Sequence, residues 1–159
     1  MPSLAVHLSA DDVRRTHLKI FYDPEQPYDA RESPQETLRE ILNARSGDIT
    51  RLLRTVQLET EQTVPQAWSY HMAIWAGLHI WPDANHRTAL YTFNMAARKA
   101  LGLYVGLPEL ASRVITRASK EMRKAAGGYA LADLTDPSHP YRRLWSLAEA
   151  ALVIRRVDR

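Results

Sequence analysis

A nine-residue stretch from His79 to Arg87 contains the side chains of this chain that are best suited to chemistry. It reads His-Ile-Trp-Pro-Asp-Ala-Asn-His-Arg and combines two imidazoles, a carboxylate and a guanidinium. The ordinary pKa of a histidine suits His79 to taking a proton from an attacking hydroxyl group. Asp83 offers a hard oxygen ligand for Mg²⁺, which usually takes one or two carboxylates together with substrate phosphates. The stretch therefore predicts a magnesium-dependent phosphate site.

The second half of the stretch is expected to bind the phosphate itself. Pro82 ends one helix because the residue before a proline avoids helical geometry, and Asn85 is placed to cap the next helix. The start of a helix presents unpaired N–H groups and the positive end of the helix dipole, which together bind anions. Ala84 and Asn85 are small enough to let a phosphate approach, and the guanidinium of Arg87 can form a fork onto phosphate oxygens.

Each of these residues also has a purely structural interpretation. A histidine at a helix end can cap it, Asp-Ala-Asn can be an ordinary turn, and Arg87 can be half of a surface ion pair. Their occurrence within nine residues is what favours chemistry. A metal-dependent hydrolase or nuclease is a weaker alternative, built on His71, His79, Asp83 and His86. It is weaker because His71 falls in an apolar helix and is expected to be a hydrogen-bonded core residue.

The stretch resembles the signature of the Fic/Doc family, usually written HxFx(D/E)(G/A)N(G/K)R. The matching residues are His79, Asp83, Ala84, Asn85 and Arg87, and the continuation Thr88-Ala89-Leu90 resembles the Doc branch. The resemblance is specific over about residues 65–101 and only general beyond them. It implies an all-α fold, a small helical bundle, with a short β-hairpin flap, which would fall at Gln57 to Val64.

The resemblance implies a role for each matching residue. His79 would be the general base for a target hydroxyl group, and Asp83 would bind magnesium. Ala84 and Asn85 would form the turn that cradles phosphate, and Arg87 would clamp it.

Three positions depart from the family pattern. Trp81 replaces the phenylalanine that anchors the loop, which is a mild change. His86 stands at a nucleotide-binding position that is glycine in AMP-transferring members and lysine in Doc-type kinases. Leu90 replaces the second arginine of AMP transferases, and this favours phosphoryl transfer. An imidazole is bulky like lysine and cationic when protonated, so His86 favours the same reaction, with activity sensitive to pH in the histidine range.

The function expected from the residues and the resemblance is transfer of part of a nucleoside triphosphate to a hydroxyl side chain of a target protein. Mg²⁺ would be the cofactor and ATP or another nucleoside triphosphate the co-substrate, with Doc-like phosphorylation preferred over AMP transfer. A catalytically silent nucleotide-binding or interaction module is the alternative from another class.

The resemblance also implies partners. Doc-type proteins are toxins held in check by a small antitoxin, and translation elongation factor Tu is one type of target. The family's inhibitory pattern (S/T)xxxE(G/N) has no complete match, because Thr55 and Glu59 have the spacing but Thr60 fails the last position. Inhibition is therefore expected from a separate partner.

Helices are expected on both sides of the stretch to position it. A buried helix should run from Pro65 to about His79, since it is apolar on nearly all sides, and a second should run from Asn85 to Gly102. The other expected helices begin at Ser9, Ser33 and Ile49, and a last one should span Tyr141 to Arg156, after a loop at Asp133 to Pro140.

A further amphipathic helix is expected between Pro108 and Gly127-Gly128. Its inward residues should be Leu110, Ala111, Val114, Ile115, Ala118 and Met122. Its basic residues, expected to be solvated, are Arg113, Arg117, Lys120 and Lys124.

Composition limits the class of protein. The 159 residues suit one domain, and the absence of cysteine excludes disulfides, thiolate zinc sites and cysteine nucleophiles. The net charge of +3 is small and the basic residues are scattered, so a nucleic-acid partner is not indicated. No run approaches the roughly 18 apolar residues of a membrane span, and the acidic N-terminal region does not resemble a signal peptide. We expect a cytoplasmic protein with no membrane partner.

Overall fold

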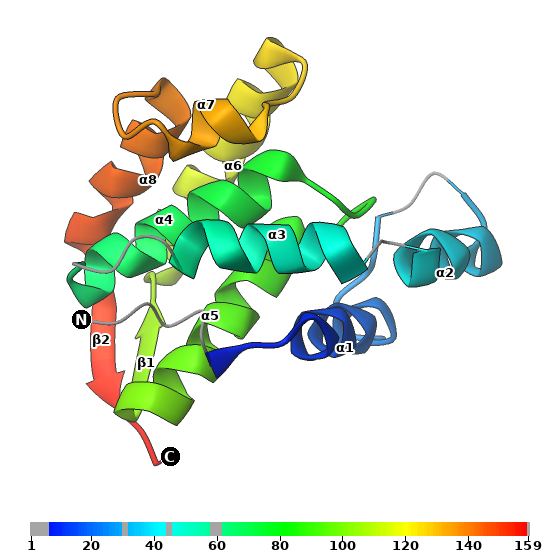
Figure 1. Cartoon of the computed structure of the whole chain (residues 1–159), viewed down its shortest axis with the longest axis horizontal. Helices are drawn as coiled ribbons and strands as arrows, with labels where there is room; N and C mark the ends of the chain where they lie inside the picture. The colour runs from blue at the N-terminus through cyan, green and yellow to red at the C-terminus, as the bar shows by residue number, and fades with distance from the viewer. Residues whose placement is uncertain (1–6, 30–31, 44–45, 58–61, 159) are drawn as a thin grey trace.

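The computed structural model describes residues 7–29, 32–43, 46–57 and 62–158. This part of the chain is mainly helical with one small sheet, which confirms the expected all-α class (Figure 1). The elements in chain order are α1 (Ala10–Phe21), α2 (Pro34–Asn43), α3 (Ser46–Gln57), α4 (Val64–Leu78), α5 (Asn85–Leu101), β1 (Leu103–Gly106), α6 (Glu109–Ala126), α7 (Leu131–Thr135), α8 (Pro140–Ala148) and β2 (Val153–Arg156). A short 3₁₀ turn, Glu149–Ala151, joins α8 to β2.

Helix α4 is the centre of the fold. Every residue from Ala67 to Gly77 is buried, because α3, α5, α7 and α8 all pack against it. This confirms the buried helix that the continuous apolar pattern predicts. Its start is fixed by Thr63, whose side chain and that of Gln66 cap each other's backbone N–H groups.

Helix α5 runs beside α4 and begins at the residue that was expected to cap it. Asn85 is the first helical residue, and Ala84 occupies the cap position without a side-chain hydrogen bond to the helix. The prediction that Asn85 is the cap is therefore wrong, because its side chain bonds back to Trp81 instead. The other end agrees with expectation, since Gly102 closes the helix with a φ of 64°.

The sheet pairs two segments that lie far apart in the sequence. β1 and β2 run antiparallel, with Tyr104 opposite Arg155. The expected helix to Arg156 is wrong beyond Ala148: Val153 and Ile154 are β-branched, and their backbone pairs with β1. Asn94 of α5 holds β1 by bonding both the N–H and the carbonyl of Val105, at 2.7 and 2.8 Å.

The expected flap at Gln57 to Val64 lies partly outside the described residues. Residues 58–61 are not among them, while Gln57 ends α3 and Val64 starts α4. The two observed strands are elsewhere in the chain.

Helix α6 has the expected bounds, and its expected inward face is confirmed in part, since Ile115 and Met122 pack against the core. Leu110 is 75% exposed and Val114 is 57% exposed, so the prediction that both point inward is wrong. Ser119 is the buried residue of this helix, and it faces α8. The docking of α6 on α8 therefore turns a small polar residue inward.

The segment from Asp133 was expected to be a loop, but its beginning belongs to α7. Leu134 is fully buried against Gly77 of α4, where a Cβ atom would lie 2.8 Å from a Leu134 methyl group and 2.9 Å from the Tyr141 ring. A tertiary contact thus stabilises a helix too short to form alone. Among the residues that the structure describes, no helix is long and apolar enough to cross a membrane.

Candidate functional site

The joint between α4 and α5 carries the residues from His79 to Arg87. Two non-glycine residues in it have left-handed backbone conformations, His79 with φ 51° and Ala84 with φ 61°. Each such residue costs roughly 1 kcal/mol, so surrounding contacts must hold it in place. Asn85 supplies two of them: its Oδ1 accepts from the Trp81 N–H at 3.2 Å, and its Nδ2 donates to the Trp81 carbonyl at 2.9 Å.

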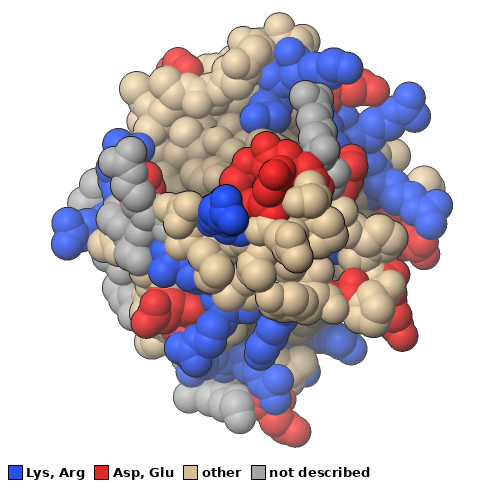
Figure 2. All heavy atoms as spheres, turned by 90° about the vertical axis from the view of Figure 1, so that its right-hand side faces the viewer, with Lys and Arg blue, Asp and Glu red and all other residues tan. Residues whose placement is uncertain are grey.

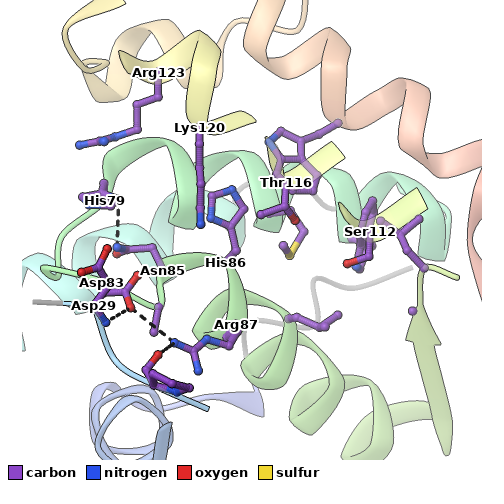
Figure 3. A pocket seen from close by; sticks show the side chains of 18 of the residues that line it. Asp29, His79, Asp83, Asn85, His86, Arg87, Ser112, Thr116, Lys120 and Arg123 are labelled. Atoms are coloured by element: carbon purple, nitrogen blue, oxygen red, sulfur yellow. Dashed lines mark hydrogen bonds and ion pairs between the residues drawn. The ribbon is translucent and has the colours of Figure 1, made fainter. Parts of the chain in front are cut away.

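The same amide of Asn85 fixes the protonation of His79. Its two bonds to Trp81 show which end of the amide is nitrogen, and this nitrogen lies 3.0 Å from His79 Nδ1 (Figure 3). Nδ1 therefore accepts, and the proton of the neutral ring is on Nε2. Burial, and then the charge of Arg123, lower the pKa of His79, so the ring is neutral at pH 7.

Asp83 and Arg87 form an ion pair at the edge of the site. Asp83 Oδ2 lies 3.5 Å from Arg87 Nη2 and accepts from the backbone N–H of Asp29 at 2.6 Å. Arg87 also donates to the side chain of Gln26 at 3.2 Å and to the carbonyl of Pro27 at 3.3 Å. The segment before α2 thus holds both charged residues in position.

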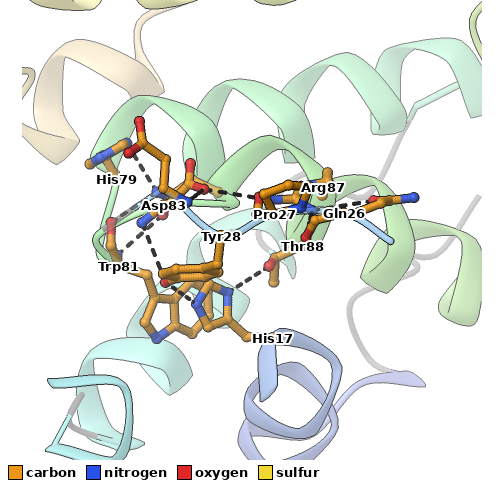
Figure 4. Close-up of polar contacts among 11 residues, drawn as sticks. His17, Gln26, Pro27, Tyr28, His79, Trp81, Asp83, Arg87 and Thr88 are labelled. Atoms are coloured by element: carbon orange, nitrogen blue, oxygen red, sulfur yellow. Dashed lines mark hydrogen bonds and ion pairs between the residues drawn. The ribbon is translucent and has the colours of Figure 1, made fainter. Parts of the chain in front are cut away.

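A chain of hydrogen bonds behind the joint links it to α1 (Figure 4). The Tyr28 hydroxyl accepts from the Asp83 N–H at 3.3 Å and lies 2.8 Å from His17 Nε2. His17 Nδ1 lies 2.7 Å from Thr88 Oγ1, and the ring of His17 stacks on Trp81. Burial lowers the pKa of His17 to about 3, so this network runs through a neutral histidine.

A cavity of about 500 Å³ opens at the joint. Its motif wall consists of His79, Asp83, Ala84, Asn85, His86 and Arg87. All six predicted site residues therefore border one space (Figure 3). Its apolar wall includes Trp68, Met72, Leu90, Leu107 and Trp145. Figure 2 shows a hollow with mostly uncharged walls on one face of the molecule, with both acidic and basic side chains around it.

His86 lines this cavity with an uncharged ring. Burial, and then the charge of Lys120, lower its pKa to about 4. Its Nε2 lies 2.7 Å from Ser119 Oγ, which lies 2.8 Å from the Tyr141 hydroxyl. The expected cationic, lysine-like imidazole is therefore wrong at neutral pH, and so is the expected pH sensitivity of this residue in the ordinary histidine range.

His71 does not border the cavity. It is buried in α4, with its Nε2 3.1 Å from Thr92 Oγ1, and burial lowers its pKa to about 3. This confirms the interpretation as a hydrogen-bonded core residue. Within the described residues, no group of three or more His, Asp or Glu side chains is placed to hold a metal ion.

Three charged residues that border the cavity were missed as site residues by sequence reasoning. Asp29 lies beside Asp83, and Lys120 and Arg123 reach the cavity from α6 (Figure 3). The solvated interpretation of the basic face of α6 holds for Arg113 and Arg117, which are exposed and pair with Glu109 and Glu121. It also holds for Lys120 and Lys124, which are exposed, but Lys120 borders the cavity as well. No local signal distinguishes Lys120 from its neighbours, because its role depends on how α6 docks.

Comparison with family models, curated proteins and solved structures found no match to this chain.

Proposed function

We propose that this chain is a magnesium-dependent transferase that moves part of a nucleoside triphosphate onto a hydroxyl side chain of a target protein. One observation carries the proposal: His79, Asp83 and Arg87 border a single cavity at the N-terminal end of α5. The cavity volume of about 500 Å³ is within the usual range for small-molecule sites, roughly 300–1,000 Å³.

The start of α5 supports phosphate binding. Its cap residue, Ala84, contributes no side-chain hydrogen bond, so the first-turn N–H groups keep their donors for a ligand. Arg87 lies in the same turn and borders the cavity. Asp83, with Asp29 beside it, is the residue that would hold Mg²⁺, which when bound neutralises phosphate charge.

In the phosphoryl-transfer form of the reaction, the hydroxyl oxygen of the target forms a bond to the terminal phosphorus. The bond from that phosphorus to its bridging oxygen breaks, and the nucleoside diphosphate leaves. His79 takes the hydroxyl proton. Its free lone pair is on Nδ1, so proton uptake requires the Asn85 amide to release Nδ1 or the ring to adopt the other tautomer. The Pro82 carbonyl favours a protonated ring and assists this step.

The choice between the two transferase reactions depends on Leu90. This apolar side chain borders the cavity where an AMP transferase would have its second arginine. Its presence supports phosphoryl transfer. The neutral state of His86 removes the lysine-like charge that also supported it, so AMP transfer remains the alternative reaction.

A catalytically silent nucleotide-binding module is the second candidate function. The contact of Asn85 with His79 Nδ1 favours it, because the resting tautomer presents a donor at Nε2 and not a base. The proposal also includes a protein substrate, an inhibitory antitoxin partner and a cytoplasmic location. These three stay predictions.

The decisive experiment incubates the protein and Mg²⁺ with a cell lysate and ATP labelled at either the terminal or the α-phosphate. Label entering a protein from the terminal phosphate alone supports the kinase. Label from the α-phosphate alone supports AMP transfer, and His86→Gly should then increase it. Nucleotide binding without any labelled protein supports the silent module. Arg117→Met is the control for the His86→Gly variant and should leave labelling unchanged, because this exposed residue of α6 does not border the cavity.

A further inference from the structure

Two cations of α6 face the joint across the cavity. Lys120 and Arg123 are one helical turn apart, and both side chains extend from α6 toward His79 and His86 (Figure 3). Residues three apart share a face of a helix, so both charges reach the same part of the cavity. Their electrostatic influence is consistent with this placement, because both lower the pKa values of His79 and His86.

Neither cation has an acidic partner in the part of the chain that the structure describes. The ion pairs there join Arg87 to Asp83, Arg113 to Glu109 and Arg117 to Glu121. Arg123 Nε is moreover buried with no hydrogen-bond partner among the described residues. A buried donor without a partner destabilises the fold, and a bound acceptor would remove that penalty.

The cation of the motif itself is already engaged. Arg87 pairs with Asp83 and donates to Gln26 and Pro27. A nucleoside triphosphate carries several negative charges, and Arg87 alone does not balance them. The positive charge still available at the cavity therefore comes from α6.

We propose that Lys120 and Arg123 form a second anion subsite that binds the outer phosphates of the nucleoside triphosphate, opposite Arg87. This inference rests on the proposed function. It adds the residues that would hold the outer phosphates of the donor, which the apolar side chain of Leu90 cannot bind. The subsite is supplied by a different helix from the motif, so the two sets of cations would approach the phosphate chain from opposite sides.

The test measures binding of ATP, ADP and AMP, each with Mg²⁺, by calorimetry. In the Lys120→Met/Arg123→Met variant, the affinity for ATP should fall roughly tenfold to a hundredfold, while the affinity for AMP changes less than about twofold. The matched control is Arg113→Met/Arg117→Met, which removes the same charge from the same helix but away from the cavity. It should leave all three affinities within about twofold.

Three outcomes would overturn the subsite. If wild type binds ATP and the double variant binds it as tightly as the control does, the subsite is wrong and the proposed function stands. An equal loss for ATP and AMP would place the cations away from the outer phosphates. If wild type binds no nucleotide, the proposed function fails as well. If the double variant does not fold, the same measurements are made on Lys120→Gln, a substitution at an exposed position. This variant too should lose more affinity for ATP than for AMP.

Discussion

The side-chain amide of Asn85 donates to Nδ1 of His79 across 3.0 Å, from a position fixed by its two bonds to the backbone of Trp81. This contact links the turn that is proposed to cradle phosphate to the histidine that is proposed to move a proton. Phosphate binding and the protonation of His79 should therefore depend on each other.

The resting tautomer of His79 is directly measurable. In ¹⁵N NMR spectra at pH 7.5, Nδ1 of His79 should resonate as an unprotonated nitrogen and Nε2 as a protonated one. Asn85→Asp replaces the donor with an acceptor, so it should raise the pKa of His79 and move the proton to Nδ1. His86 serves as the internal control, since its ring bonds Ser119 and should keep its tautomer. A protonated Nδ1 in the wild type would contradict the assignment.

His79→Ala should reduce transfer roughly a hundredfold to ten-thousandfold, because it removes the group proposed to accept the hydroxyl proton. Nucleotide affinity should change little. His79 has a left-handed backbone conformation, so His79→Asn provides the matched variant that tolerates this conformation and still lacks a base. Transfer rates and thermal unfolding of both variants would be compared. Full activity in either folded variant would remove the general-base role.

Asp83→Asn should remove the dependence of nucleotide binding and transfer on Mg²⁺, because a neutral amide is a poor ligand for a hard cation. The amide oxygen can still accept from the Asp29 N–H, so the fold should be retained. The measurement is a Mg²⁺ titration of ATP affinity and of transfer. Asp133→Asn is the matched control on α7. An unchanged titration in Asp83→Asn would show that magnesium binds elsewhere or is not used.

Stability should fall as the pH drops below about 6.5. Burial lowers the pKa values of His17 and His71 to about 3 and of His86 to about 4 in the folded state. The unfolded chain, with pKa values near 6.5, then binds more protons, so acid favours unfolding until the folded-state pKa values are reached. Each histidine contributes up to about 1.4 kcal/mol per pH unit in this window.

This pH dependence can be checked by urea unfolding between pH 8 and pH 5. His71→Gln removes one titrating ring and should make the curve of stability against pH less steep over that range. A free energy of unfolding that stays constant from pH 7 to pH 5 would mean that these histidines are not buried as described.

Local sequence signals predicted the helices around the site but not all of their ends. The continuous apolar run of α4 could only belong to a buried helix, and Gly102 and Gly127 gave reliable stops. The residue type of Asn85 favours a helix cap, and this predicts the wrong role. Its side chain instead closes the turn at Trp81, a choice that depends on the neighbouring left-handed residues.

The parts that sequence reasoning missed depend on contacts between distant segments. β2 pairs with a strand that ends 47 positions before it begins, which local periodicity does not reveal. Lys120 and Arg117 have the same charge and neighbouring positions on α6, yet only Lys120 borders the cavity. Which side of a helix meets a site is decided by docking, and here the buried Ser119 at the α8 contact determines it.

Gly77 lies in the last turn of α4, two residues before His79, and has no room for a methyl group beside Leu134 and Tyr141. These three positions should therefore covary in related chains: an alanine or serine at position 77 should be accompanied by a smaller side chain at 134 or 141. Such a compensating pair would allow α7 to shift, and with it the turn of α4 that carries the histidine.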